Sequence, residues 1–258
     1  MDLKTMILLG GLALSSVANH FNGVRNPMSN TKPSIVLVHG AFADGSAWTK
    51  VIAILQRDGY AVTAVQDAME SYAGDVATTK RAIDGQPGPV VLVGHSYGGM
   101  VISGAATDKV KALVYIAAFG MDKDETAMAL LSKYPTPLGT SLAPDSAGFL
   151  TIDRSKFHDV FAADLSARET AIMAAAQGPI KGDIFGTPMG APAWKTIPSW
   201  YLVAKSDQAI HPDLERFFAK RMNAKTTEIE SSHVPFLSNP EAVASIIEEA
   251  AKAVEAGK

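Results

Sequence analysis

The segment that most constrains the fold of this chain is Val90–Gly99, which reads VVLVGHSYGG. Its four opening apolar residues predict a buried strand, and the Ala-, Gly- and Ser-rich stretch that follows to about residue 107 predicts a closely packed helix. Ser96 lies at the junction, with Gly94 and Gly98 on either side at two-residue spacing. A turn this tight strains its central residue, admits only small neighbours and lifts the hydroxyl toward the free N–H groups of the helix start. The segment therefore predicts a nucleophilic serine, which needs a base, an acid and an oxyanion site.

Short apolar strands alternate with helices along most of the chain, with almost no period-two pattern. This alternation predicts an α/β fold with a mostly parallel sheet that helices cover on both faces. The predicted strands are 35–38, 60–65, 90–93, 112–117, 200–204 and 226–230. The predicted helices, besides the one after Ser96, are 47–58, 74–84, 165–177, 212–222 and 241–254.

The chain divides into three parts by pattern. Residues 34–119 and 197–258 carry the strand–helix rhythm and predict one α/β core. Between them, residues 120–196 lose the rhythm and become richer in proline, glycine and short amphipathic pieces. An insertion of this length between two strands predicts a lid over the carboxyl ends of the strands.

Residues 1–33 are set apart from the fold. The apolar run Met6–Leu14 followed by the small residues Ser15–Ala18 resembles a secretory signal peptide with cleavage after Ala18, and a linker follows to residue 33. The run is too short to span a membrane. We therefore expect a periplasmic or secreted protein. The alternative is a cytoplasmic protein whose first residues form a helix that packs on the body or hangs off it.

Composition excludes several classes of function. The formal net charge of −3 and the lack of any Lys/Arg cluster argue against nucleic acid or an anionic membrane as the main partner. The chain contains no cysteine, which removes disulfides, thiolate catalysis and Cys-ligated metals together. At 258 residues it is long enough to bury a sizeable core without such cross-links.

The base for Ser96 must come from one of six histidines. His233 follows the last predicted strand, and if all strands are parallel it lies at the same sheet edge as Ser96. We therefore predict His233 as the base. Structural or surface roles are expected of the others, which are His20, His39, His95, His158 and His211.

The histidine in turn needs a carboxylate that fixes its tautomer and stabilises its charged form. Asp207, just after the 200–204 strand, is the preferred acid, and Asp122, after the 112–117 strand, is its competitor. With Asp207, the order along the chain is Ser96, Asp207, His233, which is the order typical of this kind of elbow.

An oxyanion site needs at least two preorganised donors. We predict the backbone N–H groups of Tyr97, directly after the serine, and of Ala41, in the turn after the first strand. The alternative for the His39–Phe42 segment is a tight turn and nothing more. Aromatic candidates for an apolar substrate pocket, for most of which core packing stays an equal alternative, are Phe42, Trp48, Tyr97, Phe149, Phe157 and Phe161.

Taken together, these motifs resemble the α/β-hydrolase superfamily over residues 34–256. The segment Leu37–Trp48 is most similar to the compact branch that holds plant methyl-ester esterases and hydroxynitrile lyases, with bacterial esterase relatives. The resemblance implies a mostly parallel six-stranded sheet without the superfamily's first two strands, and no metal or cofactor. Lyases of this branch carry a threonine just past the first strand's histidine and a lysine just after the catalytic histidine. Here Gly40 and Val234-Pro235 stand at those places, so lyase activity is not expected.

The sequence thus predicts a serine esterase that acts on a small-molecule carboxylic ester through an acyl-enzyme. One alternative is a small-ligand binding protein or receptor on the same fold with slow or no turnover. Another is a lactonase, amidase or cofactor-free perhydrolase that uses the same three side chains, because one fold hosts several chemistries.

Overall fold

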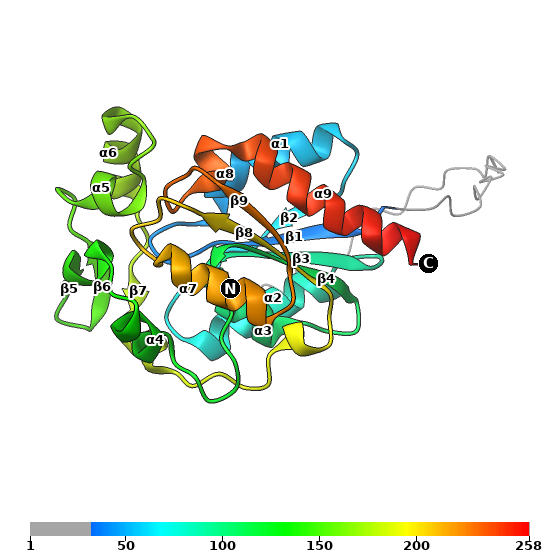
Figure 1. Cartoon of the computed structure of the whole chain (residues 1–258), viewed down its shortest axis with the longest axis horizontal. Coiled ribbons are helices and arrows are strands. Elements are labelled where there is room, and N and C mark those ends of the chain that lie inside the picture. Colours follow the sequence, from blue (N-terminus) through cyan, green and yellow to red (C-terminus); the bar gives the residue numbers. More distant parts are fainter. Residues whose placement is uncertain (1–31, 258) are drawn as a thin grey trace, which may run out of the picture. The chain divides into compact units, whose positions relative to one another are not determined.

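The computed structural model describes residues 32–257 (Figure 1). The predicted signal peptide, residues 1–18, and nearly all of the predicted linker lie outside the described residues. Within the described part, no helix is both long and apolar enough to cross a membrane.

A six-stranded sheet in the order β2-β1-β3-β4-β8-β9 forms the core. Its strands are β1 (Ser34–Val38), β2 (Val62–Ala64), β3 (Val90–Ser96), β4 (Val110–Ala118), β8 (Ser199–Ala204) and β9 (Lys225–Ile229). Every neighbouring pair is parallel. All residues of β1, β3 and β8 are buried, because helices cover both faces, and this explains why these strands are continuous apolar runs in the sequence. The predicted fold class is confirmed.

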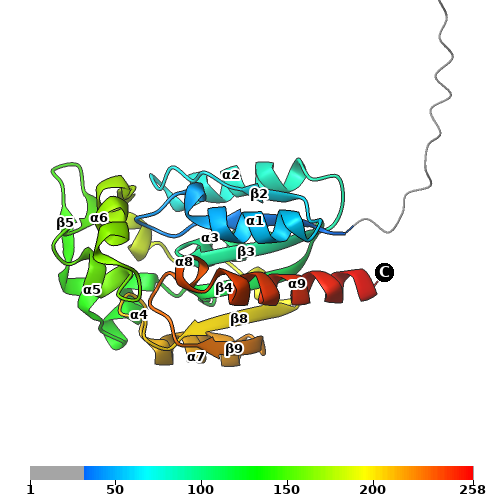
Figure 2. The same cartoon turned by 90° about the horizontal axis from the view of Figure 1, so that it is seen from above.

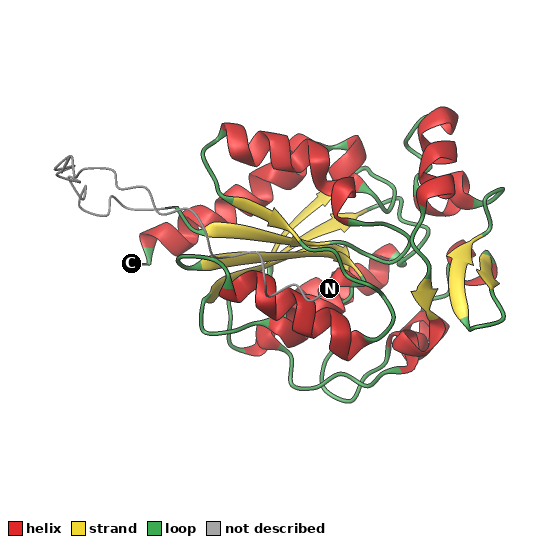
Figure 3. Ribbon diagram, turned by 180° about the vertical axis from the view of Figure 1, so that it is seen from behind, coloured by secondary structure: helices red, strands yellow, loops and turns green. Residues whose placement is uncertain are grey.

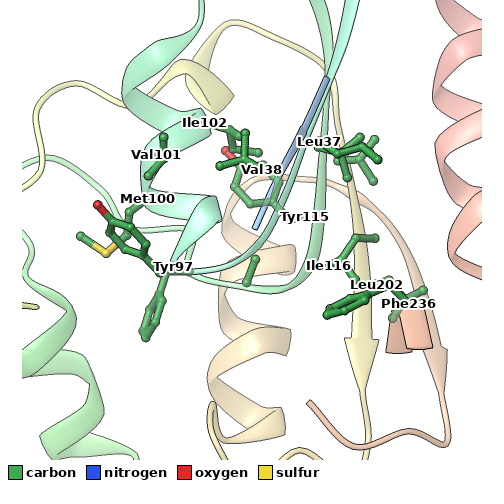
Figure 4. Packing of buried hydrophobic residues seen from close by; sticks show 14 of the residues in the cluster. Leu37, Val38, Tyr97, Met100, Val101, Ile102, Tyr115, Ile116, Leu202 and Phe236 are labelled. Atoms are coloured by element: carbon green, nitrogen blue, oxygen red, sulfur yellow. The ribbon is translucent and has the colours of Figure 1, made fainter. Parts of the chain in front are cut away.

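Helices flank the sheet on both sides (Figures 1 and 2). One face carries α1 (Thr49–Arg57), α8 (Pro235–Ser238) and α9 (Pro240–Ala256). The other carries α2 (Tyr72–Asp84), α3 (Gly98–Ala105) and α7 (Pro212–Arg221). Figure 4 shows the consequence of strand alternation, since Val38 and Tyr115 face α3 while their neighbours Leu37 and Ile116 face Phe236 on the opposite side.

Several helices and strands begin or end at other residues than predicted, and the causes are local. The helix expected from residue 47 begins as a 3-10 turn, Gly45–Trp48, because the Asp44 side chain caps it, and α1 follows only at Thr49. The strand expected at 60–65 is shorter in the structure, where β2 spans only three residues, Val62–Ala64. Ser71 caps α2, so that this helix starts two residues before its predicted start at residue 74.

The inserted segment, residues 120–196, has a sheet of its own that the sequence did not predict (Figure 3). Its strands are β5 (Leu142–Pro144), β6 (Phe149–Ile152) and β7 (Ile180–Lys181), and its helices are α4 (Ala127–Lys133), α5 (Phe157–Phe161) and α6 (Ala167–Ala176). A capping box of Ser166 and Glu169 starts α6. The segment lies beyond the carboxyl ends of the main strands (Figure 3), and a lid function for it stays a prediction.

Candidate active site

The turn between β3 and α3 holds Ser96 in a strained conformation. Its φ is +51°, in the left-handed region that non-glycine residues rarely adopt. A Cβ on Gly94 would lie 2.5 Å from the carbonyl oxygen of Gly98, and a Cβ on Gly98 would lie 2.6 Å from that of Val38. Both positions therefore require glycine, as the sequence pattern indicated.

The structure brings Ser96, His233 and Asp207 into one hydrogen-bonded chain. The Nε2 atom of His233 lies 2.8 Å from Ser96 Oγ, and its Nδ1 atom lies 2.5 Å from Asp207 Oδ2. A carboxylate only accepts, so Nδ1 carries the proton and the neutral imidazole presents its lone pair at Nε2 to the serine hydroxyl. Both His233 and Asp207 are almost completely buried, at 1 % exposure each.

Asp207 is held in place from its other side. Its Oδ1 atom accepts the backbone N–H groups of Ala209, at 2.6 Å, and Ile210, at 2.9 Å. These donors replace water around the buried charge and fix the carboxylate plane toward His233. Asp122 lies elsewhere: its carboxylate pairs with Lys195 Nζ at 2.5 Å, which lowers its pKa, and the structure does not bring it to His233.

The loop that carries His233 is anchored by residues that the sequence did not single out. Asp164, in the turn between α5 and α6, accepts the Ser231 hydroxyl at 3.0 Å and the Ser232 N–H at 2.9 Å, and it also accepts the Ser232 hydroxyl. Phe161 packs its ring on the His233 ring, with 5.0 Å between centroids. No spacing signal could have revealed Asp164, because 67 residues separate it from Ser231.

His95 supports the same loop from beneath, as expected for a histidine that points away from the serine. Its Nε2–H donates to the backbone carbonyl of His233 at 2.8 Å, and Trp48 and Phe236 pack against its ring. Burial lowers the pKa of His95 well below its usual range, so it stays neutral and cannot compete as the base.

Ala41 and Tyr97, the predicted oxyanion donors, lie in the turn after β1 and directly after Ser96. Ala41 belongs to the turn after β1, in which Phe42 has a φ of +63°, and Tyr97 directly follows Ser96 at the start of α3. Within residues 32–257, neither of the two backbone N–H groups has a hydrogen-bond partner. The Tyr97 side chain points away, because its hydroxyl donates to Asp75 Oδ2 at 2.6 Å. It is therefore not a pocket residue.

Two buried acids, Asp67 and Asp75, lie next to these two turns. His39 Nε2 accepts the backbone N–H of Asp67 at 3.1 Å, so His39 has the structural role expected of it. Among the described residues, neither carboxylate oxygen of Asp67 has a partner. Burial, and then the neighbouring Asp75, raise the pKa of Asp67 to about 8. Burial also raises the pKa of Asp75.

Ser96 and His233 open into a cavity of about 330 Å³. The core contributes Ala41 and Phe42 to its wall, whereas most of the lining comes from the inserted segment, including Met128, Leu131, Leu142, Leu150, Phe161 and Phe185. The lining residues that the structure describes include no Asp, Glu, Lys or Arg. The residues that the structure describes include no group of three or more His, Asp or Glu side chains that could hold a metal ion.

Two of the six predicted pocket aromatics, Phe42 and Phe161, line this cavity, and the other four, Tyr97 among them, do not. Trp48 packs in the core against Phe236, with 4.8 Å between ring centroids. Phe157 is buried behind Phe161, at 5.1 Å between centroids. Phe149 faces Lys181 instead, because successive residues of β6 point to opposite sides and Leu150 takes the position on the cavity.

A parallel sheet with a strained serine between β3 and α3 and a buried His–Asp pair defines an α/β hydrolase. A model of the alpha/beta hydrolase family matches residues 35–246, and the chain belongs to this family. It is 29% identical to a pyrethroid hydrolase of Sphingobium wenxiniae over 86% of this chain and 89% of that protein. It is 26% identical to methylesterase 7 of Arabidopsis thaliana over 86% and 97%. The crystal structure of a pyrethroid hydrolase from Sphingobium faniae JZ-2 superposes with a TM-score of 0.72 at 24% identity, over 86% of this chain and 98% of that one. The resemblance to the compact branch is confirmed.

Proposed function

We propose that this chain is a serine hydrolase that cleaves small, uncharged carboxylic esters through an acyl-enzyme. Relatives that match most of its length are named as a hydrolase and a methylesterase, which assigns the chain to the carboxylic ester hydrolases. The observation that carries the mechanism is the continuous chain from Asp207 through His233 to Ser96 at the floor of an apolar cavity.

In the first half-reaction, Ser96 Oγ attacks the acyl carbon while His233 Nε2 takes its proton. Asp207 stabilises the imidazolium that forms, and the N–H groups of Ala41 and Tyr97 donate to the oxyanion of the tetrahedral intermediate. When the intermediate collapses, the ester C–O bond breaks and His233 returns the proton to the leaving alcohol. Ser96 then carries the acyl group.

In the second half-reaction, His233 removes a proton from water, whose oxygen attacks the acyl carbon. The intermediate collapses with transfer of the proton to Ser96 Oγ, which releases the carboxylic acid and restores the enzyme. The left-handed backbone of Ser96 presents its Oγ at the carboxyl end of β3 for both steps.

The cavity favours uncharged substrates. A carboxylate or ammonium group bound there would lose its hydration. Among the described lining residues it would find no charged partner apart from a protonated His233. The volume of about 330 Å³ lies at the small end of the range for small-molecule sites, which supports a substrate of modest size.

The test is turnover of p-nitrophenyl acetate and butyrate by the wild type and by Ser96→Ala, with Ser103→Ala as a matched control. Ser103 is a buried serine of α3 that bonds to Gly99 and Tyr115 rather than to a histidine. We expect Ser96→Ala to lower kcat by at least about 10³-fold and to abolish the acylated species seen by mass spectrometry. Undiminished turnover in Ser96→Ala would refute the proposal. Very slow wild-type turnover together with a ligand-induced rise in Tm would favour a binding protein.

A further inference from the structure

One buried acid next to the triad has no part in the mechanism above. Glu215, in the first turn of α7, is completely buried. Its Oε2 atom accepts the backbone N–H of Ala204 at 3.0 Å. Ala204 is the last residue of β8, and its carbonyl accepts the N–H of Asp207 at 3.2 Å. Glu215 therefore holds the turn that presents Asp207 to His233.

The second oxygen of Glu215 is the unusual one. Among the described residues, Oε1 receives no N–H or O–H hydrogen bond, and the carboxyl group faces that of Asp207. Two carboxylates in contact in a dry interior cannot both be ionised, so one must hold a proton. Asp207 already accepts hydrogen bonds from Ala209, Ile210 and His233, which stabilise its charged form. The proton therefore belongs on Glu215.

Among the residues that the structure describes, no Lys, Arg or His side chain forms an ion pair with Glu215. Arg216, the next residue, turns outward to Asp213 and Glu228, with contacts of 2.9 and 2.7 Å. Tyr201, on β8, directs its hydroxyl to the backbone carbonyl of Ala118. Burial, and then the charge of Asp207, raise the pKa of Glu215 well above its ordinary value.

We propose that Glu215 is a neutral carboxylic acid that donates a hydrogen bond from Oε1 to Asp207, and that it is a positioning residue for the triad. Glu215 then completes the set of donors around the Asp207 carboxylate and fixes how strongly this carboxylate attracts the proton of His233. The inference about catalysis rests on the proposed function, whereas the protonation of Glu215 is testable without turnover.

Three variants separate the contributions. Glu215→Gln keeps both contacts, because the amide oxygen accepts the Ala204 N–H and the amide nitrogen donates to Asp207. Glu215→Leu fills a similar volume but removes both contacts. Asp213→Asn changes an exposed acid on the same helix and is the control. Each is measured by infrared difference spectroscopy against the wild type at pH 8, by Tm, and by the pH dependence of kcat/KM.

The expected infrared result is a neutral-carboxyl carbonyl band in the difference spectrum of the wild type minus Glu215→Gln, and no such band in the wild type minus Asp213→Asn. The partly protonated Asp67 contributes equally to all three proteins and cancels in both differences. We expect Glu215→Gln to keep the wild-type pH profile and most of the activity. Glu215→Leu should lower kcat/KM roughly tenfold or more, since it removes a hydrogen bond to a charged group. Its acid limb should move to higher pH, because an Asp207 that has lost a donor holds the imidazolium more strongly.

The proposal is overturned if the difference spectrum of the wild type minus Glu215→Gln lacks that band, or if Glu215→Gln moves the acid limb to lower pH, as the removal of a negative charge would do. Wild-type kinetics in a folded Glu215→Leu protein would also overturn it. If Glu215→Leu does not fold, the spectrum and profile of Glu215→Gln still decide. Full activity in Ser96→Ala would defeat the proposed function and leave the infrared result intact, so the two failures are distinguishable.

Discussion

Gly40, between His39 and Ala41, allows a sharp test of how tightly the side chain of Ser96 is packed. A Cβ at this position would lie 2.7 Å from both His95 Nδ1 and Ser96 Cβ, about 0.7 Å short of the 3.4 Å at which ordinary contact begins. His95 cannot yield, because the rings of Trp48 and Phe236 enclose it. In Gly40→Ala the strain must therefore move Ser96 or the turn that carries Ala41.

The strain in Gly40→Ala should lower both Tm and kcat. An extra methyl group in a filled core costs about 2 kcal/mol, within a range of about 1 to 3. In a chain of this size this corresponds to a fall in Tm of roughly 4 to 8 °C. A displacement approaching 0.7 Å at Ser96 should lower kcat by roughly 10- to 100-fold, because catalysis depends on near-attack geometry.

The assay combines calorimetry with p-nitrophenyl butyrate hydrolysis, and Gly88→Ala is the control. A Cβ on Gly88 meets no atom of the described residues within 4 Å, so this variant should match the wild type in both measurements. If Gly40→Ala keeps the wild-type Tm and kcat, the site around Ser96 is looser than the contacts indicate. The reasoning about the packing of the elbow would then be wrong.

Two further predictions concern buried carboxyl groups. Asp207→Asn should lower kcat about 10⁴-fold with little change in Tm, because the amide can present a donor to His233 and favour the wrong tautomer. Pre-steady-state kinetics measures the change in rate. A loss below tenfold would make Asp122 a candidate for the acid again. Burial raises the pKa of Asp67 to about 8, so the native protein keeps a proton that the unfolded chain releases, and stability falls as the pH rises toward 8. Asp67→Asn should remove this pH dependence. In urea denaturation, the free energy of unfolding of the variant relative to the wild type should rise by roughly 2 to 4 kcal/mol from pH 5 to pH 8. A difference that does not widen with pH would contradict the burial of a neutral Asp67.

The sequence predicted those parts of the site whose positions follow from chain topology. Ser96, Asp207 and His233 each follow a strand, and parallel strands end at one sheet edge, so the structure brings them together as expected. The sequence could not predict which side chains line the cavity, because this depends on the direction in which each side chain points. Phe42 lines the cavity and Trp48 does not, although both are large aromatics near the same turn.

Other features escaped because their signals are weak or absent. The strands of the inserted segment have at most four residues, too few to show a period. Glu215 did leave a trace, since it shares a helix face with the buried Phe218 and Ala219, three and four positions further on. An acidic residue in such a position indicates a buried carboxyl group, which proteins rarely keep without a specific partner.

The inserted segment contacts the loop that carries His233, and these contacts link substrate selectivity to turnover. Asp164 and Phe161 belong to the part of the chain that shapes the cavity, yet they also hold the loop and the ring of the proposed base. A change around Phe161 and Asp164 that alters substrate choice therefore also alters the support of the base. Selectivity and turnover should evolve together in this molecule, and a grafted segment from a relative should work only if it brings equivalents of these two residues.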